Sequence, residues 1–156
     1  MDPEEMRERS ARSMPHTTVV AAIDTHIASL GAVLVAAEIA TMNGTGLSVV
    51  HVHRPHTTWP SPVGAVSPHL WREVDEARAR ALRAEVATLL DLFPQQQWSF
   101  TWLTGSPRRE LARWMQHERP LAVVVGRPRH VRPRVGAPVA TWLIGQAGMP
   151  AVVAAR

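Results

Sequence analysis

Apolar residues recur along the chain in short runs that are separated by turn-forming residues. Five of these runs predict β-strands, near residues 18–23, 47–53, 97–103, 121–126 and 150–154. The runs at 18–23, 47–53 and 121–126 are mostly apolar, which is typical of strands that are buried on both faces. The run at 97–103 alternates between apolar and polar residues and predicts a half-exposed edge strand.

Helical periodicity fills the intervals between the strands. Residues 27–42 predict a helix that ends at Asn43-Gly44, and Ser67-Pro68 is expected to cap a second helix that runs to about Leu92. A short helix is expected at 108–118 and a fourth after Gly136. The first apolar stripe consists of Ile27, Leu30, Leu34, Ala37 and Thr41, with Val33 and Ala40 beside it, and the second of Leu70, Val74, Ala77, Ala81, Val86 and Leu89.

This alternation of strands and helices predicts an α/β fold. We expect a doubly wound, Rossmann-like, five-stranded parallel sheet in the order 3-2-1-4-5, with four helices in a three-layer α/β/α arrangement. Such sheets bind ligands at the carboxyl ends of the strands where the strand order reverses. Here that point lies between the strand that ends at Asp24 and the strand that ends at Gly126.

Two segments fall outside this pattern. Residues 1–16 mix acids with arginines and have little to bury, so we expect a flexible N-terminal leader followed by one domain at 17–156. Residues 54–68 hold four prolines and a glycine and are long for a connection. We expect them to form a lid or a loose excursion that is poorly ordered without ligand.

Composition excludes several kinds of chemistry. The 156 residues include no cysteine and no lysine, so disulfides, thiol catalysis, a Walker-type lysine and Schiff-base chemistry are excluded. No apolar run approaches the roughly 18 residues of a membrane span, and the N-terminus lacks a signal-peptide core. We therefore expect a cytoplasmic protein without membrane contact. The net charge of +4 is modest, and no basic patch is interleaved with aromatic residues, so nucleic-acid binding is not expected.

An arginine-rich loop follows the strand that ends at Gly126. Its four arginines are Arg127, Arg129, Arg132 and Arg134. A buried strand, a turn and a helix N-terminus commonly form an anion site, and arginine forks bind phosphate in two-point contacts. The alternative is a solvated turn on an arginine-rich chain.

Other candidate residues have structural alternatives as well. Asp24 either orients a ribose or caps the next helix. His51 and His53 share one face of a strand at a spacing that a metal could use, but without nearby carboxylates or cysteines we expect packing roles and predict no metal. Trp98 and Trp102 are explained better by an edge strand that meets a helix than by base stacking. No Ser/His/Asp grouping has catalytic spacing, so no catalytic residue and no enzyme is predicted.

From about residue 17 to 155 the sequence resembles the universal stress protein family. The resemblance rests on the order and spacing of several segments taken together. They are VVAAID at the first strand, VVHVH at the second, Gly105-Ser106-Pro107 before the third helix, VVVG at the fourth strand, and a final strand after Met149-Pro150. The resemblance implies a stress-response regulator that binds ATP or another adenine nucleotide, or binds none, and that pairs through its last strand.

The resemblance also implies a ligand site, with departures from the family pattern. Nucleotide-binding members carry Gly-x2-Gly-x9-Gly-Ser/Thr after the fourth strand, whereas Arg129 stands here at the second glycine and Ala137 replaces the hydroxyl residue. Only six residues separate Arg129 from Gly136. Arginine adopts positive φ only with strain, and a lost hydroxyl removes a phosphate hydrogen bond. The expected cofactor-binding residues are Ala22, Asp24, Val52, Gly105, Gly126, Arg127, Arg129, Gly136 and Ala137.

Three classes of function follow from these observations. The first is a regulatory protein that binds an adenine nucleotide at the point between the first and fourth strands, through a degenerate glycine loop. The second is a ligand-free dimeric interaction module. The third is an adenine-nucleotide hydrolase, which is disfavoured because Asp24-Thr25-His26 stands where its phosphate loop would lie. The C-terminal strand carries Val152 and Val153 without a protective charge, so we expect a homodimer through this edge.

Overall fold

The computed structural model describes residues 18–24, 27–54, 68–126 and 151–154. Its elements begin and end within two residues of the predicted positions. The leader, residues 55–67 and the helix predicted after Gly136 lie outside the described residues. The elements are β1 (Thr18–Ile23), α2 (Ile27–Asn43), β2 (Gly46–His53), α3 (Pro68–Leu90), β3 (Trp98–Thr104), α4 (Pro107–Glu118), β4 (Ala122–Gly126) and β5 (Ala151–Ala154).

The strands form a parallel sheet in which β1 is central. β1 pairs with β2 from Thr18↔Gly46 to Ile23↔His51, and with β4 from Val19↔Ala122 to Ala22↔Val125. β3 pairs with the other edge of β2, which confirms the predicted order 3-2-1-4 for these four strands. β5 lies beside β4, with Gly126↔Ala154 as its last pair.

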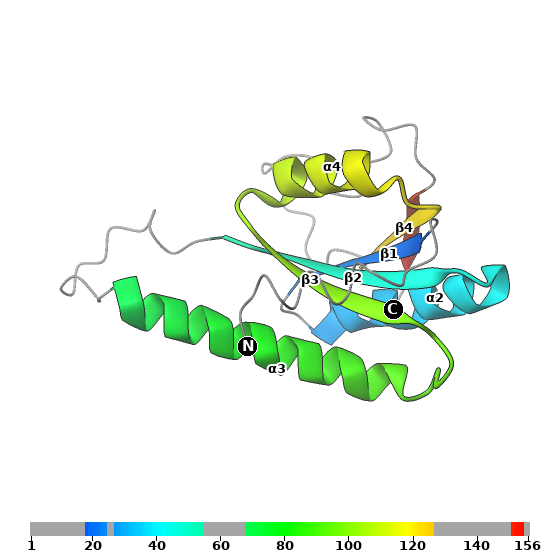
Figure 1. The fold of residues 1–156 in the computed structure, drawn as a ribbon, viewed down its shortest axis with the longest axis horizontal. Helices are drawn as coiled ribbons and strands as arrows, with labels where there is room; N and C mark the ends of the chain where they lie inside the picture. The colour runs from blue at the N-terminus through cyan, green and yellow to red at the C-terminus, as the bar shows by residue number, and fades with distance from the viewer. Residues whose placement is uncertain (1–17, 25–26, 55–67, 127–150, 155–156) are drawn as a thin grey trace.

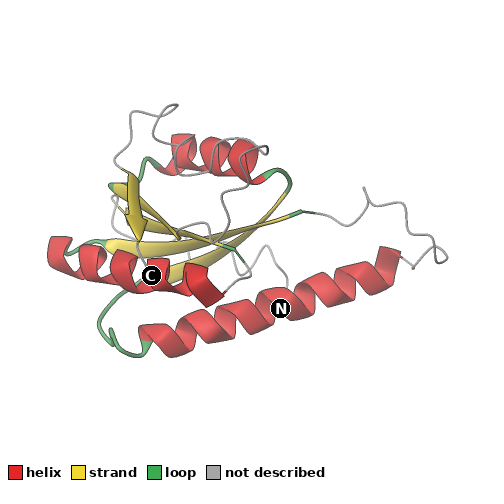
Figure 2. Cartoon of the chain, turned by 180° about the vertical axis from the view of Figure 1, so that it is seen from behind, coloured by secondary structure: helices red, strands yellow, loops and turns green. Residues whose placement is uncertain are grey.

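Helices cover both faces of the sheet (Figure 1 and, from behind, Figure 2). Successive residues of a strand point to opposite faces, so β1 contributes to two separate cores. Val19 and Ala21 pack with α2 and α3 on one face, whereas Val20 packs with Leu111 and Met115 of α4 on the other. These residues are almost completely buried, as expected for a parallel sheet that lies between two helical layers.

α2 contacts the sheet through small side chains. Its buried residues are Ser29, Ala32, Val33, Ala36, Ala37 and Ala40. Leu30 and Leu34 are only half-buried, and Thr41 is exposed, so the predicted stripe is displaced from the true contact face. A helix that presents alanines can approach the sheet closely, and the larger Val35 and Ile39 then pack at its flanks.

The predicted apolar stripe of α3 is wrong in its N-terminal half. Leu70 is 51% exposed, and Ala77 and Ala81 are exposed as well. The N-terminal end of α3 extends past the end of the sheet in both views, so the sheet does not cover this end of the helix. The buried residues on the C-terminal half are Leu82, Val86 and Leu90, at helical spacing.

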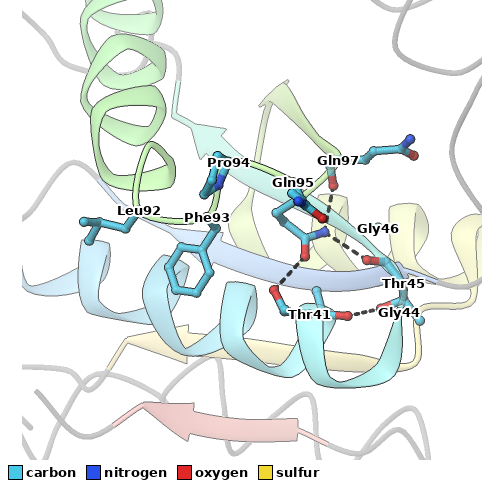
Figure 3. A pocket seen from close by; sticks show the side chains of 11 residues that line it. Thr41, Gly44, Thr45, Gly46, Leu92, Phe93, Pro94, Gln95 and Gln97 are labelled. Atoms are coloured by element: carbon cyan, nitrogen blue, oxygen red, sulfur yellow. Dashed lines mark hydrogen bonds between the residues drawn. The ribbon is translucent and has the colours of Figure 1, made fainter.

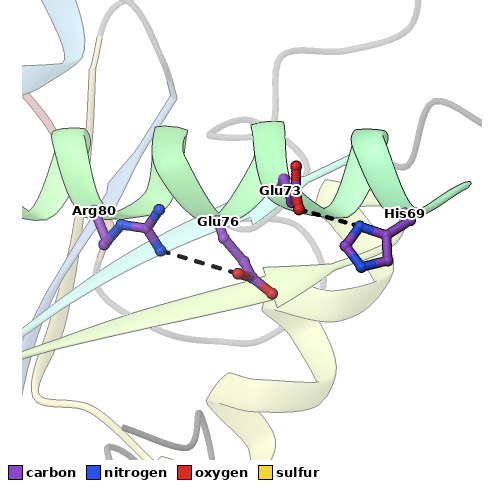
Figure 4. Close-up of polar contacts among 4 residues, drawn as sticks. All are labelled: His69, Glu73, Glu76 and Arg80. Atoms are coloured by element: carbon purple, nitrogen blue, oxygen red, sulfur yellow. Dashed lines mark ion pairs between the residues drawn. The ribbon is translucent and has the colours of Figure 1, made fainter. Parts of the chain in front are cut away.

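The outer face of α3 is charged. His69 Nδ1 lies 3.2 Å from Glu73 Oε1, and Arg80 lies 4.0 Å from Glu76, in two pairs spaced four residues apart along the helix (Figure 4). These side chains are more than half exposed, and such pairs contribute little to stability. None of the helices in the described part of the chain has the length and apolar character needed to span a lipid bilayer.

The tryptophans of β3 have the packing role that the sequence predicts. Trp98, Phe100 and Trp102 alternate along the strand, so their side chains share one face of the sheet. All three pack against the core that α2 and α3 form with β1 and β2.

Gly105 connects β3 to α4 in a conformation that other residues rarely adopt. Its φ is +143°, and its N–H donates a hydrogen bond to the carbonyl oxygen of His53 at 2.8 Å. Ser106, the next residue, occupies the N-cap position of α4 without a side-chain capping hydrogen bond. A Cβ at this position would lie 2.8 Å from Cγ of Glu110. Gly44, after α2, also has positive φ (+61°), but a Cβ there would meet nothing within 4 Å.

This difference predicts unequal effects of two alanine substitutions. Gly105→Ala should lower the free energy of unfolding by about 2–3 kcal/mol, because backbone strain adds to the overlap with Glu110. Gly44→Ala should cost about 1 kcal/mol, since only strain remains. Urea unfolding of both variants measures the difference, and equal losses would contradict the assigned conformation of Gly105.

Candidate functional site

The strand order reverses at the carboxyl ends of β1 and β4, where the sequence places the candidate site. Ala22 is in register with Val125, so the chain leaves β1 beside the end of β4 at Gly126. The side chain of Asp24, one residue beyond β1, is exposed. Asp24 and Gly126 therefore lie at the same edge of the sheet, on adjacent strands.

The backbone at Asp24 is held by the first turn of α2. The Asp24 N–H donates to Ser29 Oγ at 3.2 Å, and the Ser29 hydroxyl donates to the Asp24 carbonyl oxygen at 2.9 Å. Ser29 is itself buried. A strand end that is fixed in this way presents its exposed side chain in a defined position, and residue spacing alone does not indicate this link.

The other predicted site residues are spread along the same edge. Ala22 and Val52 lie on the α4 face of the sheet, on adjacent strands, and both pack partly against its core. Gly105 follows β3, which is two strands away from β1. Arg127, Arg129, Gly136 and Ala137 lie outside the described residues.

His51 lies directly behind this edge, on the opposite face of the sheet from α4. Its Nδ1 is 3.0 Å from the carbonyl oxygen of Ile23, and only 3% of the residue is exposed. A carbonyl oxygen can only accept a hydrogen bond, so Nδ1 carries the hydrogen. Burial lowers the pKa of His51 below its ordinary value of 6.5, against the opposing effect of the bond to Ile23.

His53 continues this row and reaches α3. Its Nε2 lies 3.0 Å from Asp75 Oδ2, and both side chains are mostly buried. The ring of Trp102 contacts both histidines, with centroids 4.5 Å from His51 and 5.4 Å from His53. The two histidines thus have packing roles in which an aromatic ring of β3 covers them.

Metal binding is not supported by this arrangement. In the described segments, no group of three histidine, aspartate or glutamate side chains is placed to hold a metal ion.

Asp75 was missed by the sequence reasoning, because a carboxylate on the packing side of a helix interrupts the apolar stripe. The only signal for it was the spacing of His51 and His53, which placed two polar side chains on a buried face.

A pocket in the described part of the chain lies at the opposite, amino edge of the sheet. It is formed by the end of α2 and the connection from α3 to β3 (Figure 3). Gln96 lines this pocket and forms three hydrogen bonds. Its Oε1 accepts from the Thr41 hydroxyl at 3.0 Å, and its Nε2 donates to the carbonyl oxygens of Thr45 and Gln97, each at 2.9 Å. These contacts serve to join loops, and the pocket shares no residue with the predicted site.

The buried position of His51 predicts loss of stability in acid. Its pKa is lower in the folded state than in the unfolded chain, so the unfolded chain binds the proton first as the pH falls. The free energy of unfolding should therefore decrease between about pH 7 and pH 5, and His51→Asn should reduce this slope. Urea unfolding across this range measures it, with His117→Asn on the exposed face of α4 as the control. An unchanged slope in His51→Asn would contradict the prediction.

Solved structures with a similar fold include three nucleotide complexes. A universal stress protein in complex with cAMP is 17% identical, with a TM-score of 0.67, and the match covers 90% of this chain and 97% of that protein. The universal stress protein of Archaeoglobus fulgidus with dAMP is 17% identical, with a TM-score of 0.63 over 88% and 96%. A family protein of Arabidopsis thaliana with AMP bound is 17% identical, with a TM-score of 0.58 over 88% and 90%. At these identities the likeness shows the fold.

Comparison of the sequence with models of protein families identifies the family of this chain. A search of curated protein sequences finds no significant match. The model of the universal stress protein family matches residues 15–154, which is nearly the whole chain. The match spans every described strand and helix, including the β1 and β4 ends that meet at Asp24 and Gly126. The chain therefore belongs to the universal stress protein family.

Proposed function

We propose that this chain is a stress-response regulator that binds an adenine nucleotide at the carboxyl ends of β1 and β4. The observation that carries the proposal is the exposed Asp24, whose backbone Ser29 holds beside the end of β4. The proposal retains a cytoplasmic homodimer that acts without catalysing a reaction. It also retains the complete domain of five strands and four helices, in which the fourth helix begins after Gly136.

The described residues offer contacts for a nucleoside. An ionised carboxylate only accepts hydrogen bonds, and ribose hydroxyls donate them, so Asp24 would orient the sugar. Ala22 and Val52 are partly exposed, small and apolar on the α4 face of the sheet. They would contact the flat base without competing for its polar groups.

The sequence after β4 supplies candidate contacts for the phosphate end of the ligand. Gly126 allows a close turn, and Arg127 and Arg129 follow it at once. The nucleotides in the three related structures, cAMP, dAMP and AMP, each carry one phosphorus. A single phosphate needs fewer loop contacts than three, which suits a loop without the second glycine and the hydroxyl residue.

The proposal predicts an asymmetry between two pairs of arginines. Replacing Arg127 and Arg129 with alanine should weaken binding of ATP or phosphate at least tenfold, or about 1.4 kcal/mol, because these residues are nearest to the strand end. Replacing Arg132 and Arg134 should do much less, since exposed arginines are screened by salt. Calorimetric titration with ATP, ADP, AMP and cAMP decides it, and equal losses in the two double variants would refute the assignment.

A ligand-free interaction module is the second candidate function. The observation that favours it is Arg129 at the second glycine of the loop, together with Ala137 in place of the hydroxyl residue. If calorimetric titration with ATP, ADP, AMP and cAMP at millimolar concentration gives no heat of binding, the ligand-free interaction module is the better explanation of the fold. Steady-state turnover of ATP would instead support a hydrolase.

The nucleotide-binding regulator and the ligand-free module would each form the expected homodimer through β5. The edge beyond β5 has no paired strand among the described residues, and Val152 and Val153 lack a protective charge. Ala151→Lys with Val153→Lys should abolish pairing through β5, because the lysines would lie at the pairing edge, and should leave a monomer where β5 is the only interface. Light scattering of the double variant measures the mass, and an unchanged mass would argue for another interface.

A further inference from the structure

The sheet has a second edge, at β3, that is longer than the edge at β5. β3 spans seven residues and β5 spans four. Within the described residues, β3 pairs only with β2, over seven consecutive pairs that contain no bulge. The strand WSFTWLT contains no charged residue and no proline.

Half of the backbone groups of β3 face away from β2. The carbonyl oxygen of Gln97 accepts from the Leu47 N–H at 3.0 Å, and the Gly105 N–H donates to the His53 carbonyl oxygen. Alternate residues of a strand direct their backbone groups to the same side, so the odd-numbered residues of β3 bond to β2. The outward-facing residues are Trp98, Phe100, Trp102 and Thr104.

Natural proteins protect such edges in a few recognised ways. Charged side chains, proline, bulges and short strands all prevent an edge from pairing with another chain. β3 has none of these protections. Four outward pairs of N–H and C=O groups over an uninterrupted strand therefore form a template for another strand.

We propose that β3 pairs antiparallel with β3 of a second copy of this chain, about a two-fold axis at Thr101. This register matches Phe100 with Trp102 and Trp98 with Thr104. It is the one antiparallel register in which all four outward-facing residues find partners of the same kind, because Thr101 is the centre of the strand. Any shift leaves at least one of them without a partner.

The side chains fit this self-pairing. On the α2 and α3 face, Phe100 of one copy would lie beside Trp102 of the other, and cross-strand aromatic pairs stabilise antiparallel strands. Thr101 lies on the α4 face, like Leu103, and would face its own copy. Because the strand is uncharged, the symmetric pairing brings no like charges together, whereas a charged partner strand would gain no counter-charge from β3.

The absence of cysteine in the chain allows a direct test of this register. In an antiparallel pair, opposite residues that are not hydrogen-bonded have Cα atoms about 4.5 Å apart, which is within the range of a disulfide, about 4.4–6.8 Å. Thr101→Cys should therefore form a covalent dimer under mild oxidation, visible on a non-reducing gel. Thr88→Cys, at an exposed site on α3, is the matched control and should stay mostly monomeric. The proposal is overturned if Thr101→Cys yields no more dimer than Thr88→Cys.

Charge reversal at the same position gives a second test in solution. Thr101→Lys and Thr101→Glu should each weaken association through this edge at least tenfold, because like charges would lie opposite each other across the axis. An equimolar mixture of the two variants should restore association, whereas the same substitutions at Thr88 should have no effect. Sedimentation velocity at several concentrations measures this, and a mixture that associates no more than either variant alone would refute the pairing.

These tests are independent of the nucleotide site and of the β5 edge. The cross-link at residue 101 should persist in the Ala151→Lys, Val153→Lys background, because those substitutions lie at the other edge of the sheet. Loss of the cross-link in that background would show that β3 contact depends on β5 and would overturn the proposal as stated.

Discussion

The burial of β1 between two neighbouring strands and two helical layers is the constraint on which the rest of the structure depends. A strand in this position must satisfy its backbone through β2 and β4 and must be apolar on both faces. Val19, Val20 and Ala21 meet this requirement with complete burial. A charged residue can follow where β1 leaves the sheet, and the first residue there is Asp24. The place of the candidate site thus follows from the packing of the strand that leads to it.

The strand pattern was predictable because burial on two faces leaves a plain signal in sequence. The runs at 18–23, 47–53 and 121–126 are apolar for this reason, and the β1/β4 junction followed from their order. The contact face of α3 was not predictable from periodicity. The helix extends past the sheet, so Leu70 is apolar without being buried, whereas Asp75 is mostly buried and bonded to His53. The apolar residue is exposed and the charged residue is mostly buried, which is the reverse of what their polarity predicts. The position of α3 relative to the sheet explains both.

The candidate site was likewise predictable in part. Asp24 and Gly126 were placed correctly beside each other, because parallel strands that are adjacent end at one edge. The contacts that hold this edge were not foreseen. Ser29 binds both backbone groups of Asp24, and His51 bonds to Ile23 from another strand. The His51 contact depends on the register of two strands, and the Ser29 contacts depend on the angle at which the chain turns from β1 into α2, so the apolar pattern indicates neither.

The three hydrogen bonds of Gln96 join the loops at the amino end of the sheet to one another. At the amino end, one side chain joins the end of α2 and the segment after it to the start of β3, so displacing either loop would break hydrogen bonds to Gln96. At the carboxyl end, the described links include those of Ser29 with Asp24, of His51 with Ile23 and of Gly105 with His53. The start of β2 and the start of β3 are thus joined by a side chain as well as by backbone pairing, so the register of these two strands does not depend on the strand hydrogen bonds alone.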